Sequence, residues 1–488
     1  MAASEGHDPD LPIKLGPASN GEFLPLPLGP VELEAIRRTK DESARHARRL
    51  GIDRRDFLRS IGGAALMLGA IAACGAEEKG SRGERAGGTY KTPDDPADAD
   101  AAAEALSGNE IVFDVQTHYL NFELGAVGGF TGLQGLADSF PQSRCGEADS
   151  KACFSVEQYL DLLFAQSDTA MTVLSAIPIP DQINPLGIDD MELALAMADQ
   201  LCGDGRVLLH GGVQPTMGPM GAQIEGMASL VQDHPISAWK IYTHAPGQGW
   251  WLDDHDANTP KVGHDFLRRV AETGPRIVCV HKGFSAGSDY ASPIDIGPAA
   301  KANPDIDFVV YHSGFEAGAV EGPYVAGNRP QGVDRLLASV QSSGIGAKEN
   351  VYAELGSTWW ILMRDPTQAA HVLGKLLKVF GPDRILWGTD SLWYGSPQDQ
   401  IQAFRAFEIS SEFQETYGYP ALTPETKAKI LGKNALTLYN VEPPTTRCSF
   451  TSQELAEARR AQPASWRTFG PSTERELVAL LDAHGGMI

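Results

Sequence analysis

Four polar residues that could bind a divalent metal ion each follow a short run of apolar residues. His118 ends the run Phe-Asp-Val-Gln-Thr-His, His281 ends Val-Cys-Val-His, His312 ends Val-Tyr-His and Asp390 ends Trp-Gly-Thr-Asp. Three imidazoles and a carboxylate that are brought together can hold such an ion in an open site. The ion would lower the pKa of bound water to about 7, and a nearby base would complete its activation. The four residues therefore predict metal-assisted chemistry.

The elements expected to position these residues are eight strands that alternate with helices. Each strand is nearly continuously apolar, as strands covered on both faces are. Asp365-Pro366 predicts a helix start and Gly381 its end. This alternation predicts a (β/α)8 TIM barrel of the α/β class, in which the carboxyl ends of the strands meet at one mouth. An open doubly wound sheet is the alternative, which the lack of a glycine-rich dinucleotide fingerprint after the first strand disfavours. The expected strands are 111–116, 171–176, 206–213, 238–242, 276–280, 307–311, 350–354 and 384–387.

The order of these residues resembles that of the amidohydrolase superfamily, in the branch that includes aminocarboxymuconate-semialdehyde decarboxylase. The resemblance covers roughly residues 109–440, the barrel and its closing helix. It implies one divalent metal ion, zinc first and manganese second, bound by His118, His281 and Asp390. It also implies that His312 activates water or orients the substrate, and that Asp390 moves the proton.

One position departs from the family pattern, because Gln116 stands where the first histidine is expected. Gln116 and His118 are two residues apart on a strand, so they share a face and point the same way. An amide oxygen is a weaker ligand than imidazole for zinc. Three interpretations follow. Three protein ligands hold the metal with Gln116 at the edge, or the site prefers an oxygen-tolerant ion such as manganese, or the metal is absent and the site only binds.

Other side chains near the strand ends are candidates for substrate contacts. Lys240 ends the fourth strand and is expected to pair with a charge or contact the substrate, with a carbamylated bridging ligand as the alternative. Glu354 ends the seventh strand and acts either as a second acid or as an ion-pair partner. Trp251, Trp359 and Trp393 lie in loops after the fourth, seventh and eighth strands. There they form either the wall of an apolar substrate site or part of the packing.

The region before the barrel is predicted to be an export signal and a tether. Arg54-Arg55 precede Phe-Leu and an uncharged run, 61–76, that is too short to cross a bilayer comfortably as a helix. A basic region before such a run is typical of an export signal, and the paired arginines resemble a twin-arginine signal. Ile-Ala-Ala-Cys, ending at Cys74, resembles a bacterial lipobox and predicts a lipid anchor, with a buried helix as the alternative. Residues 77–108, rich in Ala, Gly, Asp and Pro, are expected to be a flexible linker.

Composition limits the partners and the domains. The 488 residues carry 40 Lys+Arg and 63 Asp+Glu, and the resulting net charge of −23 disfavours nucleic acid as a partner. Six scattered cysteines are too few for a disulfide framework, and Cys145 and Cys153 either pair or stay independent. The predicted regions are a flexible leader with its signal at 1–76, a linker at 77–108, the barrel at 109–441 and a C-terminal extension at 442–488, with helices near 452–460 and 473–483.

Together these features predict an exported, lipid-anchored, metal-dependent hydrolase that acts on a small C–N or C–O substrate. Non-oxidative decarboxylation in the same site is the first alternative, and a catalytically inactive binding lipoprotein is the second. The expected location is the cell envelope, on the periplasmic or outer face of the cytoplasmic membrane. The lipid anchor is the only membrane contact expected, and self-association into a homo-oligomer is left open.

Overall fold

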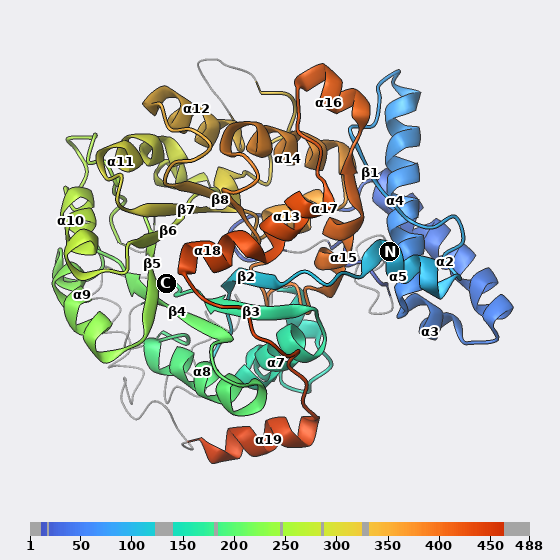
Figure 1. The fold of residues 1–488 in the computed structure, drawn as a ribbon, viewed down its shortest axis with the longest axis horizontal. Coiled ribbons are helices and arrows are strands. Elements are labelled where there is room, and N and C mark those ends of the chain that lie inside the picture. The colour runs from blue at the N-terminus through green and yellow to red at the C-terminus, as the bar shows by residue number, and fades with distance from the viewer. Residues whose placement is uncertain are drawn as a thin grey trace.

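The computed structural model of the protein describes residues 11–16, 19–122, 140–179, 184–244, 247–284, 287–324 and 331–462. Figure 1 shows a barrel of strands surrounded by helices, with a group of N-terminal helices packed against one side. The barrel carries the candidate site, and the N-terminal region contributes to it.

Eight parallel strands form the barrel and are hydrogen-bonded in chain order. Backbone hydrogen bonds join the last strand to the first, from Val115 N to Trp387 O at 3.0 Å and from Asp390 N to Gln116 O at 2.9 Å. The predicted TIM barrel is confirmed, because each of the eight predicted strands overlaps an observed one. These are β2 (Val112–Thr117), β3 (Thr169–Leu174), β4 (Val207–Val213), β5 (Ile236–Tyr242), β6 (Ile277–His281), β7 (Asp307–Tyr311), β8 (Val351–Glu354) and β9 (Ile385–Leu386).

Helices cover the outside of the barrel and shield the apolar strands from water, as Figure 1 shows. The Asp365 side chain accepts hydrogen bonds from the backbone N–H groups of Thr367 and Gln368, so this helix begins at Pro366 and stops before Gly381, as predicted. Among the described residues, the α-helices after β2 are α7 (Val156–Leu160), α8 (Ile188–Cys202), α9 (Ala222–Asp233), α10 (Gly263–Thr273), α11 (Ile296–Ala302), α12 (Asp334–Ser343), α13 (Thr358–Leu362), α14 (Pro366–Phe380), α15 (Gln398–Ala406), α16 (Ser411–Tyr417), α17 (Pro424–Ala428), α18 (Asn434–Tyr439) and α19 (Ser452–Ala461).

The segment 77–108 has regular structure, so the predicted flexible linker is wrong. Its first residues continue α4 (Ile61–Ser81), and its middle forms β1 (Gly88–Tyr90), which pairs antiparallel with β10 (Phe407–Ile409). The helix α5 (Ala99–Leu106) follows. Strand pairing uses backbone N–H and C=O groups and needs no large apolar side chains. A composition poor in apolar residues was therefore a poor guide to order in this segment.

The leader forms α2 (Pro30–Leu50), α3 (Arg54–Leu58) and α4, and α4 packs against α14 and α15 of the barrel (Figure 1). Cys74 lies inside α4 and is only 4% exposed. Within the described part of the chain, α4 is the one helix long and apolar enough to cross a membrane, and half of its most apolar stretch is buried inside the molecule. The cysteine of the predicted lipobox is therefore packed within a helix in this structure.

The first described residues, 11–16 and 19–29, form a segment that we call the N-terminal strap. Leu11, Ile13 and Leu15 are buried among the residues of the core. Lys14 Nζ forms an ion pair with Asp399 of α15, at 3.1 Å from Oδ1. The strap is thus attached to the barrel from its beginning, before it continues to the candidate site.

Two disulfides join described cysteines, Cys145–Cys153 and Cys202–Cys448. The first realises one of the two alternatives left open by the sequence. The second connects α8 to the C-terminal extension. Within that extension, α19 confirms the helix predicted near 452–460, whereas the helix predicted at 473–483 lies outside the described residues.

Candidate metal centre at the mouth of the barrel

The four residues predicted to act together lie side by side at the carboxyl ends of their strands. His118 Nε2 lies 3.2 Å from Asp390 Oδ1, and the rings of His281 and His312 are 4.7 Å apart between centroids. Gln116 links the two pairs, because its Nε2 lies 3.0 Å from Asp390 Oδ1 and 3.5 Å from His312 Nε2. All five side chains belong to residues that are 2% exposed or less. The convergence expected of a barrel mouth is therefore present.

At this mouth, three residues have a left-handed backbone conformation that residues other than glycine rarely adopt. His312, Ser357 and Asp390 have φ angles of 61°, 53° and 62°. Each such residue costs about 1–3 kcal/mol and persists only where the surrounding structure holds it, which is common at functional sites. Glu354 supplies part of that support, because its Oε2 accepts a hydrogen bond from His312 N at 2.9 Å. Burial raises the pKa of Glu354 to about 8. Glu354 thus positions His312.

Two imidazoles are oriented by backbone carbonyls. His118 Nδ1 donates to Ser175 O at 2.8 Å, and His312 Nδ1 donates to Gly356 O at 2.7 Å. A carbonyl only accepts, so each Nδ1 carries a hydrogen and each Nε2 faces the cluster. Metal-binding histidines are held in this way. Burial also lowers the pKa of His281 and His312, which favours the neutral rings that bind metals.

The Asp390 carboxylate receives several donors at once. Trp393 Nε1 lies 3.2 Å from Oδ1 and Ser357 Oγ lies 2.6 Å from Oδ2, in addition to the contacts from Gln116 and His118. Burial opposes ionisation, but the hydrogen bond and the charge of His118 hold the pKa of Asp390 below its usual range. The site therefore stabilises Asp390 as an anion.

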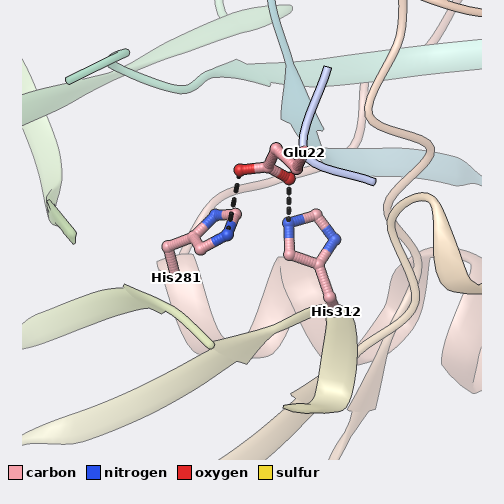
Figure 2. A group of neighbouring side chains, drawn as sticks. All are labelled: Glu22, His281 and His312. Carbon is pink, nitrogen blue, oxygen red and sulfur yellow. Dashed lines mark ion pairs between the residues drawn. The ribbon is translucent and has the colours of Figure 1, made fainter. Parts of the chain in front are cut away.

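Sequence reasoning missed two residues of the site, Asn20 and Glu22, which the N-terminal strap carries into the cluster. Figure 2 shows Glu22 between the two imidazoles, with Oε1 at 3.0 Å from His281 Nε2 and Oε2 at 3.9 Å from His312 Nε2. Asn20 Nδ2 donates to Asp390 Oδ2 at 2.9 Å. Burial raises the pKa of Glu22. No motif or periodicity in this stretch pointed to the barrel, so no sequence signal could have found either residue.

Lys240 and Trp393, predicted to contact substrate, lie at or near the cluster. The Trp393 ring stacks on His118 with 5.3 Å between centroids, and its indole contacts Asp390 as described above. Lys240 is fully buried, with Nζ 3.7 Å from the centroid of the Tyr311 ring and no hydrogen-bond partner among the described residues. Burial lowers its pKa to about 8. Lys240 thus lies within the barrel on aromatic rings.

The other two tryptophans are packing residues in this structure. Trp359 is fully buried, donates through Nε1 to Gln400 O at 2.9 Å and packs against Phe404. The prediction that Trp359 lines the substrate site is therefore wrong, because the ring fills the space between α13 and α15. Trp251 is 5% exposed and packs against Tyr290, with ring centroids 5.1 Å apart.

The donor set fits a divalent metal ion. Neutral imidazole nitrogens and ionised carboxylate oxygens are the ligands that zinc and manganese take in proteins. Neither ring nitrogen of His281 has a hydrogen-bond partner among the described residues, although the residue is 1% exposed. A buried polar atom without a partner is costly, and a bound cation would remove that cost. His118, His281, His312, Asp390 and Glu22 are the residues that could hold the ion.

Comparison with known protein families shows to which family this barrel belongs. Residues 189–441, more than half of the chain, match the family model described as Amidohydrolase. The chain therefore belongs to the amidohydrolase family and is an enzyme of that class. The matched region includes His281, His312 and Asp390, whereas Gln116 and His118 precede it. No curated protein matches the chain.

Several solved barrels are similar to the chain at low identity. An uncharacterized TIM-barrel protein from Bordetella bronchiseptica has 16% identity and a TM-score of 0.43, over 68% of this chain and 98% of that chain. A putative 2-pyrone-4,6-dicarboxylic acid hydrolase from Pseudomonas putida has 16% identity and a TM-score of 0.40, over the same shares. A 5-carboxyvanillate decarboxylase from Novosphingobium aromaticivorans, complexed with manganese, has 16% identity and a TM-score of 0.41, over 68% and 97%. The assignment rests on the family match.

Proposed function

We propose that the protein is a metal-dependent hydrolase that acts on a small substrate with a C–N or C–O bond. The observation that carries this proposal is the orientation of the histidines. Backbone carbonyls fix Nδ1 of His118 and of His312, so both Nε2 atoms face the carboxylates of one buried cluster. That cluster lies where barrel enzymes place their catalytic groups.

In this proposal His118, His281 and Asp390 hold the ion, which is zinc or manganese. The ion supplies a Lewis acid that polarises a carbonyl and lowers the pKa of water. Asp390 accepts the proton of the attacking water, because its carboxylate is kept ionised by its donors. His312 presents Nε2 as an acceptor, so it takes up a proton or binds the ion. Stabilisation of an oxyanion by His312 would require a protonated ring, which the buried site disfavours.

The state of Asp390 favours hydrolysis over decarboxylation. Non-oxidative decarboxylation in this site would need Asp390 to deliver a proton to carbon. The donors from Gln116, Trp393, Ser357 and Asn20 all stabilise the carboxylate, which makes it a proton acceptor first. Release of CO₂ without release of an amine or alcohol would overturn the choice of hydrolysis and keep the class of enzyme.

The test is to screen the full-length protein against small lactones, amides and aromatic acids, with metal content measured in parallel. We expect close to one zinc or manganese ion per chain, loss of turnover in a chelator and recovery when the ion is restored. The variant Asp390→Asn should bind less metal and lose turnover, whereas Asp383→Asn, on the surface, should change neither. Less than about 0.1 metal ion per chain that zinc, manganese and cobalt fail to restore would favour the inactive binding protein.

We also propose that the chain belongs to the aminocarboxymuconate-semialdehyde-decarboxylase-like branch and is exported by a twin-arginine-type route. The exposed Arg54-Arg55 pair before the apolar α4 supports export, and so do the two disulfides, because disulfides persist mainly in oxidising compartments. Replacing both arginines by lysine should retain the protein in the cytoplasm. Lipid attachment at Cys74 predicts a membrane-bound form that Cys74→Ser abolishes, and unchanged fractionation of both variants would refute this localisation.

A further inference from the structure

The contact between Glu22 and His312 brings two hydrogen-bond acceptors face to face. His312 Nδ1 is committed to Gly356 O, so its Nε2 carries a lone pair, and this lone pair faces Glu22 Oε2 at 3.9 Å. His281 Nε2 lies 3.0 Å from Glu22 Oε1 without a hydrogen bond between them. Acceptors that face each other in a buried site repel unless a proton or a cation lies between them.

The separations suit a shared cation. Ligand atoms at about 2.0–2.2 Å from an ion, at right angles to one another, lie about 3 Å apart. The distance from His281 Nε2 to Glu22 Oε1 has this value, and one donor atom from each of Glu22, His281 and His312 lies within 4.8 Å of the others. One ion can therefore contact all three side chains after small adjustments.

Gln116, on strand β2, does not direct a ligand atom toward the cluster in this structure. Gln116 directs Nε2, a donor, to Asp390 and His312. Its Oε1 lies close to Gly356, at 2.2 Å from the point where a Cβ on that glycine would be. In this structure Gln116 presents an N–H group to the cluster, and an N–H group does not bind a cation, whereas its Oε1 is buried without a hydrogen-bond partner among the described residues. A carboxylate from another part of the chain can supply the missing ligand.

The strap holds Glu22 in place through contacts on both sides of it. Asn20 donates to Asp390 Oδ2 at 2.9 Å, and the Phe23 ring stacks on Phe284 with 5.0 Å between centroids. Farther back, Lys14 pairs with Asp399. We propose that Glu22 is a ligand of the catalytic metal ion and takes the position that Gln116 does not fill. This inference rests on the metal-dependent function proposed above, and it makes the N-terminal strap a part of the active site.

The test measures metal affinity in the full-length chain. The protein is freed of metal with a chelator and titrated with Mn²⁺, with free ion followed by electron paramagnetic resonance. Glu22→Gln should weaken binding by about tenfold or more, and Glu22→Ala by more than Glu22→Gln. Glu34→Gln is the matched control, because Glu34 is a carboxylate of the same leader that pairs with Arg37 and Arg38 away from the site. It should bind Mn²⁺ as the unaltered protein does.

A second measurement separates ligation from a change in fold. The visible absorption of bound Co²⁺ reports the number and type of its ligands, so Glu22→Gln should change this spectrum while circular dichroism stays the same. Unchanged Mn²⁺ affinity and an unchanged Co²⁺ spectrum would overturn the role of Glu22 and leave the proposed function standing. Absence of metal binding in the unaltered protein would overturn both.

Discussion

A buried ion pair next to the candidate centre gives a prediction of definite size. Lys282 follows His281, and its Nζ lies 2.8 Å from Asp295 Oδ1 and 2.9 Å from Oδ2. Both residues are 0% exposed, and Lys282 also donates to Tyr290 O at 3.0 Å. Lys282→Met removes the cation and leaves the Asp295 charge buried beside Leu252 N, its one backbone donor among the described residues.

Breaking a buried pair in this way costs about 3–5 kcal/mol, because the remaining charge is neither hydrated nor paired. We therefore expect Lys282→Met to lower the free energy of unfolding by this amount in urea at pH 7, with the disulfides intact. Lys282→Met with Asp295→Asn should recover most of the loss, since neither charge remains. Lys429→Met is the control, because its pair with Asp383 has a similar distance of 2.7 Å but lies on the surface, where ion pairs contribute little.

The two lysines differ in burial, so the comparison of their variants tests whether burial sets the size of the loss. Equal effects of Lys282→Met and Lys429→Met would refute the claim that burial controls the size of the loss. A double variant that is no more stable than Lys282→Met would show that packing of the lysine stem, and not the unpaired Asp295, causes the effect.

Three further predictions concern the site and its surroundings. Gln116→His adds an imidazole beside the centre and should slow the loss of metal to a chelator by about tenfold. It should also recover part of the metal affinity that Glu22→Gln loses. An unchanged rate of metal loss would show that residue 116 does not reach the ion. Burial lowers the pKa of His371 from 6.5 to about 4, so the unfolded chain binds a proton that the folded protein does not bind between these pH values. The free energy of unfolding should therefore fall by about 3 kcal/mol as the pH drops from 6.5 to 4. In urea titrations, His371→Asn should flatten this dependence. Gly388→Ala would place a Cβ 1.7 Å from Glu354 Oε1 and should cost about 1–3 kcal/mol in urea, whereas Gly346→Ala, which meets no atom within 4 Å, should not.

The barrel was predictable because its strands carry a strong local signal. A strand covered on both faces is a short apolar run, and a polar residue at its end stands out against that run. For this reason His281, His312 and Asp390 could be assigned to one mouth before their distances were known. The chain order of the strands then determined which ends are neighbours.

The remaining parts of the site depend on contacts between distant segments. Glu22 lies more than 250 residues from His281 along the chain, and it is followed by a short run in which leucines alternate with prolines, 24–28. Nothing local shows that this segment reaches the barrel. The position of Trp359 was missed for a similar reason, because an aromatic residue in a loop after a strand packs toward either the mouth or the outer helices. The helix α5 was also missed, because the segment was judged by its composition, although Asp98 at the start of an alanine-rich run is a local signal for a helix.

The path of the leader links maturation of the chain to the chemistry of its centre. If a signal peptidase cleaved before Cys74 to prepare it for acylation, Glu22 and the barrel histidines would belong to separate polypeptides. The excised peptide would stay only through noncovalent contacts such as that of Lys14 with Asp399. Cleavage at Cys74 and a centre completed by Glu22 are therefore compatible only if the released peptide stays bound to the barrel, so the strap contacts would then hold together an enzyme of two polypeptides.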